Sequence, residues 1–110
     1  MVNHSPSYRI KQVDTEISLV LRKVEIHKLS QKNRELLAKL QQELNDARIY
    51  SRDYEGADNP EDRMKNAAFA KKWLKRAHRD MLSASEHNIF GAVEVAQLSA
   101  QIDQIIGGLK

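Results

Sequence analysis

Apolar residues recur at steps of three and four along most of the chain, which is the period of one helix face. Neither Gly nor Pro falls between Ser7 and Glu55, so this pattern favours a single helix over residues 9–55. The apolar face nevertheless changes position along the segment, and a break at Ser30–Asn33, whose side chains could cap a second helix, is the alternative. One set consists of Ile10, Val13, Ile17, Val20, Leu21 and Val24, and the other of Ile26, Leu29, Leu36, Leu37, Leu40, Leu44, Ala47, Tyr50 and Tyr54.

The second set also reads as a heptad repeat, which predicts coiled-coil-like packing. One seam position holds Ile26, Asn33, Leu40, Ala47 and Tyr54, and the other holds Leu29 and Leu36. The repeat is imperfect because Glu43 occupies a seam position. Asn33 is either a polar seam residue that fixes register or a capping residue, and the pattern does not separate the two.

A turn is predicted at residues 55–60. Gly56 suits the end of a helix, Asp58 or Asn59 suits the next N-cap, and Pro60 suits the first helical position. A returning helix over 60–82 follows. Ser83-Ala-Ser-Glu86 resembles a capping box, which predicts a further helix over 84–106.

This last helix is apolar on two sides, and a helix with two apolar faces needs partners on both. The hairpin can cover one face, so a second copy of the chain is predicted to cover the other, in a homo-oligomer with a dimer favoured. One side carries Ile89, Ala92, Val93, Ala96 and Ala100. The candidate interface residues, on the other side, are Val95, Leu98, Ile102, Ile105 and Ile106.

Composition agrees with a helical protein. Of 110 residues, 30% are charged and 5% aromatic, and only two are Pro, which is typical of long helices rather than of β-sandwiches or barrels. We expect a mobile N-terminal arm over residues 1–8 and one all-α domain over 9–110, a long helical hairpin or coiled-coil-like helix bundle completed by oligomerisation. Cysteine, a secretory signal and a long apolar span are all absent, so we expect a cytoplasmic protein.

Positive charge is concentrated in one segment. The chain carries a net charge of +3, and Arg63–Arg79 contains seven basic residues and no acid, so the remainder would carry −4. Helical spacing places most of these cations opposite an apolar stripe of Ala67, Ala70, Trp73, Leu74, Ala77 and Met81. The candidate anion- or partner-binding residues are Lys65, Lys71, Lys72, Lys75, Arg76 and Arg79.

Catalytic chemistry has little support in the sequence. No two of the four histidines are three or four residues apart, and the acids around Gly56 do not fit a calcium loop. A phosphate loop, a nucleophile elbow and a cysteine nucleophile are also missing. We expect no catalytic residues, no metal and no cofactor, and therefore no enzyme.

Three interpretations of function remain. The favoured one is a non-enzymatic helical interaction or scaffold protein acting through oligomeric helix packing, with an acidic protein as a candidate partner. The alternative is a nucleic-acid-binding protein that uses the basic helix 63–79, although the near absence of interleaved aromatic residues argues against stacking on single strands. In the third, acids such as Glu35, Glu43 and Asp46 neutralise the basic face, which then has no partner. Less favoured than these three is a bundle enzyme with a carboxylate or histidine site between helices, which would require a bound metal.

Overall fold

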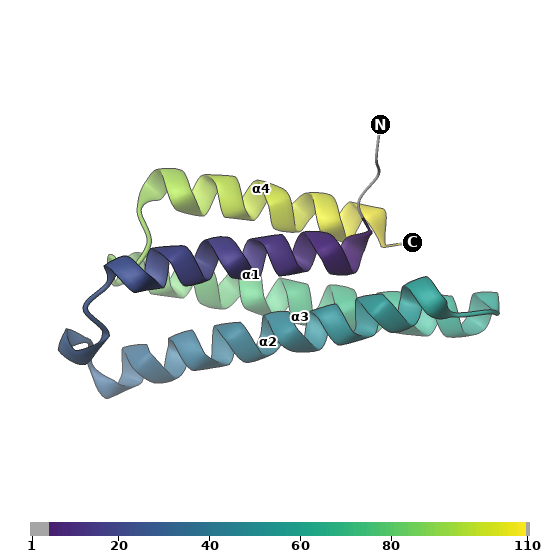
Figure 1. The fold of residues 1–110 in the computed structure, drawn as a ribbon, viewed down its shortest axis with the longest axis horizontal. Coiled ribbons are helices and arrows are strands. Elements are labelled where there is room, and N and C mark those ends of the chain that lie inside the picture. Colours follow the sequence, from purple (N-terminus) through teal and green to yellow (C-terminus); the bar gives the residue numbers. More distant parts are fainter. Residues whose placement is uncertain (1–4, 110) are drawn as a thin grey trace.

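A computed structural model describes residues 5–109, and within them it contains only helices (Figure 1). The helices are α1 (Pro6–Lys23), a short 3-10 helix η1 (Ile26–Lys28), α2 (Gln31–Gly56), α3 (Pro60–Glu86) and α4 (Ala92–Gly108). The predicted all-α class is confirmed. Of the predicted arm over 1–8, residues 1–4 lie outside the described part, and residues 6–8 belong to α1. None of the helices in the described part is long and apolar enough to cross a membrane.

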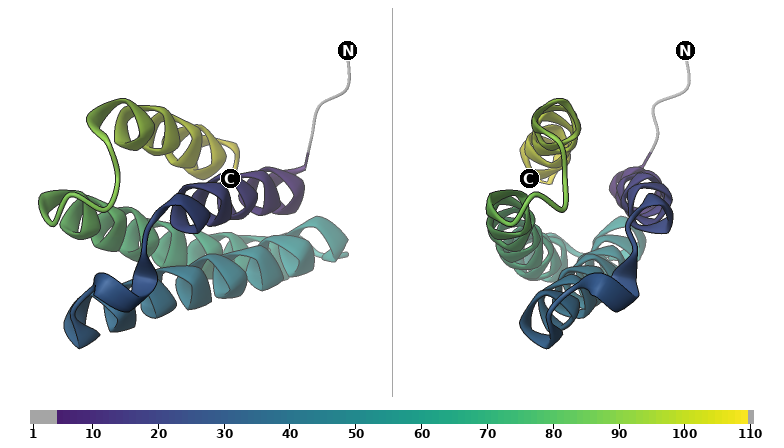
Figure 2. Two further views of the ribbon diagram at one scale, coloured as in Figure 1. Left: turned by 60° about the vertical axis from the view of Figure 1, so that its left-hand side comes forward. Right: turned by 90° about the vertical axis from the view of Figure 1, so that its left-hand side faces the viewer.

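Consecutive helices run antiparallel and surround a common core. The main contacts between the described α-helices are in the pairs α1–α2, α2–α3, α3–α4 and α1–α4 (Figure 2). The α2–α3 interface is the most extensive, and the turn between these two helices projects beyond the ends of α1 and α4 (Figure 1). The structure therefore contains the predicted hairpin turn within a bundle of four helices rather than in a long two-helix rod.

The single helix favoured over 9–55 is wrong, because the chain breaks between Lys23 and Gln31. Ser30 is the N-cap of α2, and its hydroxyl accepts a hydrogen bond from the Asn33 backbone N–H at 3.2 Å. The break lets α1 fold back along α2, so that two apolar stripes on different helix faces reach the same core. Buried residues of both stripes include Ile10, Val13, Ile17, Leu21, Leu37, Leu40 and Leu44.

The boundary between the last two helices also differs from the prediction. Residues 83–86 continue α3 instead of starting a new helix, so the expected helices 60–82 and 84–106 are replaced by α3 and α4. Asn88 takes the left-handed conformation, with φ of 60°, in the connecting turn. The backbone N–H of Gly91, the N-cap of α4, donates to Glu94 Oε1 at 3.1 Å, which fixes the true helix start.

The turn before α3 matches the sequence pattern. Asn59 caps the helix by accepting a hydrogen bond from the Asp62 backbone N–H at 2.8 Å, and Pro60 occupies the first helical position. The predicted apolar side of α3 lies in the core, with small residues that let α2 approach closely. Its buried members are Ala67, Ala70, Leu74, Ala77 and Met81, whereas Trp73 is only partly buried.

Helix α4 buries one side and exposes the other. Leu98, Ile102 and Ile105 lie in the core of the single chain, and Val95 and Ile106 pack against it. The five candidate oligomer-interface residues are therefore covered wholly or partly by the chain's own helices, so the argument that they need a second copy does not hold. The exposed side carries Ala92, Val93, Ala96 and Ala100, with Val93 70% exposed. Oligomerisation itself stays a prediction.

Candidate functional site

The basic face of α3, defined as Lys65, Lys71, Lys72, Lys75, Arg76 and Arg79, lies on the solvent side of that helix. Lys71 is half-buried and the other five are exposed. They take this orientation because Ala70, Leu74 and Ala77, on the opposite side of the same turns, are held in the core. From Lys65 to Arg79 the face extends about 21 Å along the helix at 1.5 Å per residue.

Acidic residues do not pair with this face within the described chain. The ion pairs found among residues 5–109 join Lys28 to Glu25 and Lys39 to Asp80, and neither includes a member of the basic face. The acids considered as neutralising partners form no ion pair with the face, although the charge of Arg79 acts on Glu43. Glu35 accepts a hydrogen bond from Gln31, Asp46 accepts one from Gln42, and Glu43 is buried.

An aromatic ring borders the basic face. The Trp73 side chain is partly buried against the core, and two cations lie over its ring. Arg76 Cζ is 5.0 Å and Lys72 Nζ is 5.8 Å from the ring centroid. Arg63, the seventh cation of the segment, instead lies over the Tyr54 ring at 4.6 Å, near the turn between α2 and α3. A tryptophan flanked by two cations thus lies at the edge of the basic face. The sequence pattern had placed this residue in the core.

Two buried carboxyl groups, which the sequence analysis did not single out as a site, meet between α2 and α3. Glu43 is 2% exposed and Asp80 is 5% exposed. Three of their oxygens have no hydrogen-bond partner among the described residues: both carboxyl oxygens of Glu43 and the Oδ2 of Asp80. Lys39, on the surface of α2, places its Nζ 3.8 Å from Asp80 Oδ2. The sequence signal was present, because both acids occupy positions in register with apolar residues that face the core.

The environment of the pair favours a bound proton. The pKa of Glu43 is raised from 4.5 to about 7, first by burial and then by the neighbouring Asp80, whose carboxyl can share a proton with Glu43 in a hydrogen bond and whose negative charge disfavours ionisation. The positive charges of Lys39 and Arg79 act against this rise. Two carboxylates are both hydrogen-bond acceptors, so the unpartnered oxygens acquire a partner only when one group is protonated. Near neutral pH the pair is therefore suited to hold one shared proton.

Side-chain hydrogen bonds also link α1 to α2 and α3 to α4. His78 Nε2 on α3 and Ser99 Oγ on α4 form a hydrogen bond of 2.9 Å. Between α1 and α2, burial raises the pKa of the Asp14 carboxyl, and the charge of Arg48 partly offsets this rise. These groups are dispersed over different interfaces and do not converge on one cavity.

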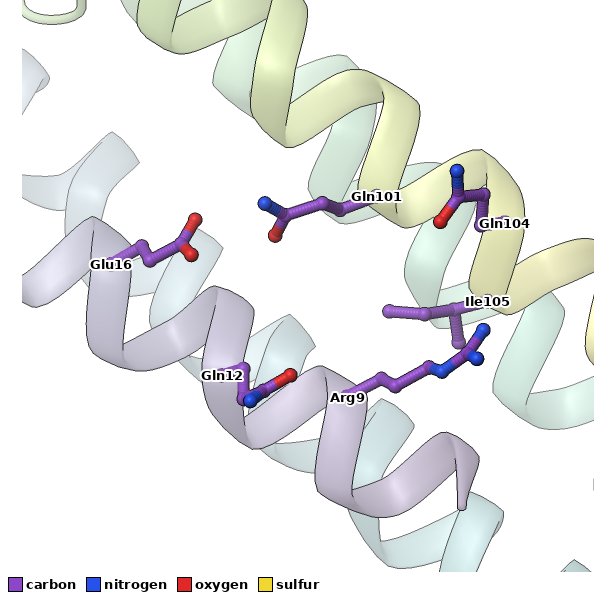
Figure 3. A pocket seen from close by; sticks show the side chains of 6 residues that line it. All are labelled: Arg9, Gln12, Glu16, Gln101, Gln104 and Ile105. Atoms are coloured by element: carbon purple, nitrogen blue, oxygen red, sulfur yellow. The ribbon is translucent and has the colours of Figure 1, made fainter. Parts of the chain in front are cut away.

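An open cleft of about 300 Å³ separates parts of α1 and α4 (Figure 3). Arg9, Gln12 and Glu16 on α1 face Gln101, Gln104 and Ile105 on α4. Its polar lining consists of three amides and one charge of each sign, so it contains no nucleophile next to a base. The cleft is therefore a polar gap between two lightly packed helices.

Among the described residues no group of three or more His, Asp or Glu side chains is arranged to hold a metal ion. Comparison of the chain with protein-family models, curated proteins and solved structures returns no match. Two features of the molecule therefore bear on its function, the basic face of α3 and the carboxyl pair buried between α2 and α3.

Proposed function

We propose that this protein is a non-enzymatic helical interaction protein that binds an acidic partner protein through the basic face of α3. The observation that carries the proposal is that six cations share one helix face and none of them pairs with an acid of the described chain. A surface of positive charges that form no ion pairs within the chain attracts a partner of opposite sign and raises its rate of association.

The fold supports this role by holding the cations in a fixed array. Helix α3 is anchored along its length by buried side chains that pack between α2 and α4. The charges are therefore presented with little loss of conformational freedom on binding, apart from that of the lysine and arginine side chains themselves.

Fluorescence anisotropy with labelled poly-L-glutamate as the acidic probe tests the proposal. We expect binding at low ionic strength that weakens steeply with added salt, because the contacts are between exposed charges. The double variant Lys72→Glu/Arg76→Glu should lose at least tenfold in affinity, since each exposed charge contact contributes up to about 1 kcal/mol and charge reversal replaces attraction by repulsion.

A matched control changes the same amount of charge elsewhere. Lys11 on α1 and Arg52 on α2 are both exposed and lie outside the basic face. Lys11→Glu/Arg52→Glu should weaken binding far less than the α3 variant. Equal losses in the two double variants would show that net charge alone is responsible and would overturn the assignment to α3.

Nucleic acid is a second candidate partner, and Trp73 is the observation that favours it. An indole ring beside Lys72 and Arg76 combines a stacking surface with phosphate-binding charges. Trp73 is the only tryptophan in the chain, so its fluorescence reports directly on this face. Titration with single-stranded RNA and duplex DNA should quench that fluorescence if bases stack on the ring, whereas poly-L-glutamate lacks bases that could do so.

The outcomes separate the candidates. Tight, tryptophan-quenching binding to RNA or DNA combined with weak binding to poly-L-glutamate would replace the acidic-protein proposal with the nucleic-acid one. Failure of every polyanion to bind at low salt would overturn both.

A further inference from the structure

The carboxyl pair of Glu43 and Asp80 lies close to one end of the basic face. The charges that act on Glu43 come from the two helices that enclose it: Lys39 on α2, and Asp80 and Arg79 on α3. Arg79 is itself a member of the basic face and precedes Asp80 in the chain. The charge state of a buried pair is thus linked to an exposed cation that a partner would contact.

We propose that the Glu43–Asp80 pair is a proton-dependent switch that adjusts how strongly the basic face of α3 binds an anionic partner. This inference rests on the function proposed above. Its structural basis is the burial of both carboxyl groups, the lack of a hydrogen-bond partner in the described chain for the Glu43 oxygens and Asp80 Oδ2, and the ion pair in which Lys39 Nζ lies 3.8 Å from Asp80 Oδ2.

The mechanism follows from charge balance. With one proton between them the two groups carry a single negative charge, which the neighbouring Lys39 and Arg79 more than compensate. Loss of that proton adds a second negative charge inside the protein, where charges are screened less than in water. This added charge lowers the positive potential around Arg79 and attracts both cations toward the interior. Binding of an anionic partner should therefore weaken as pH rises.

The reciprocal effect is required by linkage. A partner that prefers the protonated state must make that proton harder to remove, by the same factor that the proton improves its binding. Helix α3 provides the physical connection because Asp80 faces the core while Arg79, one residue earlier, faces solvent.

Glu43→Gln is the matched variant for the test. The amide has the size of the protonated acid, is always neutral and can donate a hydrogen bond to Asp80. Because histidine protonation also favours polyanion binding at low pH, the informative quantity is the difference in pH dependence between wild type and variant. Circular dichroism at each pH verifies that both proteins are folded.

The affinity for labelled poly-L-glutamate is measured at pH 6.2 and pH 8.2 and at constant low ionic strength. We expect the wild-type protein to lose about fivefold more affinity than Glu43→Gln over this range. Carbon-detected NMR of the Glu43 carboxyl, with and without the probe, should show that the probe raises the pKa of this group. This second measurement needs no variant.

Each outcome has a distinct meaning. Equal pH dependence of binding in the two proteins, or a pKa of the Glu43 carboxyl that the probe does not change, would overturn the switch while leaving the proposed function intact. Lack of binding by the wild-type protein at both pH values would overturn the proposed function, and the switch with it.

Discussion

Glu43 on α2 and Asp80 on α3 bury their carboxyl groups against each other inside the most extensive helix interface of the protein. When both groups are ionised, such a pair destabilises the folded protein, because like charges repel and neither group can donate a hydrogen bond. A single bound proton neutralises one of the two groups, which removes the repulsion and supplies a hydrogen-bond donor. The stability of the α2–α3 hairpin should therefore depend on that proton.

Stability should decrease between pH 5 and pH 8. The pKa of Glu43 is raised to about 7 in the folded protein, so the folded state holds this proton more tightly than the unfolded chain does. The resulting stabilisation is complete below pH 4.5 and is lost as pH rises through about 7. We expect the free energy of unfolding, measured with urea, to fall by on the order of 2 kcal/mol from this group.

The Glu43→Gln variant isolates that contribution, because other groups, including Asp14, titrate in both proteins. Its unfolding free energy should vary less with pH than that of the wild type, and it should be the more stable protein at pH 8. A variant with the same pH slope as wild type would contradict the assignment to Glu43.

Removal of the N-cap of α2 should lower the stability of the protein. This cap lies where the sequence pattern allowed either a break or a continuous helix. Ser30→Ala deletes the hydroxyl that accepts the Asn33 N–H, at an expected cost of about 1 kcal/mol. Ser30→Asp supplies another acceptor and serves as the control, with near wild-type stability. If both substitutions leave urea unfolding unchanged, the cap is not a stabilising feature.

The hydrogen bond between α3 and α4 should contribute a similar amount. Ser99→Ala leaves His78 Nε2 without this partner in a half-buried position, so we expect a loss of about 1 kcal/mol in thermal or urea unfolding. Thr15→Ala is the comparison, because its hydroxyl bonds only to the Lys11 carbonyl oxygen on the exposed surface of α1. Its effect should stay within about 0.5 kcal/mol.

Truncation on the two sides of α4 should have unequal effects on stability. Ile102 is fully buried, and Ile102→Ala should lower the free energy of unfolding by about 2–5 kcal/mol because it leaves a cavity in the core. Val93 is 70% exposed, and Val93→Ala should change the free energy of unfolding by less than about 0.5 kcal/mol. Comparable losses would mean that α4 is not packed through the Ile102 side in solution.

The predicted homodimer can be tested on the same helix. Because Leu98, Ile102 and Ile105 are occupied within the chain, a second copy on α4 would have to contact the exposed side that carries Val93 and Ala96. Light scattering on a sizing column should then detect a dimer that Val93→Asp converts to a monomer. A monomeric wild-type protein at micromolar concentration would rule the dimer out.

Several elements were predictable because their cause is local. Asn59 and Pro60 start α3 through capping and a preset φ angle, and both act within one turn of the helix. The orientation of the basic face likewise follows from helical spacing, since Lys72 and Arg76 must lie opposite Leu74 and Ala77. The start of α4 was misplaced because residues 83–86 can cap a helix or continue one, and packing of Ala84 in the core selects continuation.

The sequence by itself determined the helical class, the turn before Pro60, the apolar stripes and the acid-free run of cations, because each is set by residues close together in the chain. Only the tertiary structure decided that α1 folds back at Ser30, that α4 completes the core of a single chain, and that Glu43 meets Asp80. These depend on which faces pack together, and the burial gained by joining two stripes in one core outweighs the helix propensity of residues 24–30. The pairing of two acids 37 positions apart is a consequence of that packing, which is why the seam position of Glu43 did not reveal Asp80 as its partner.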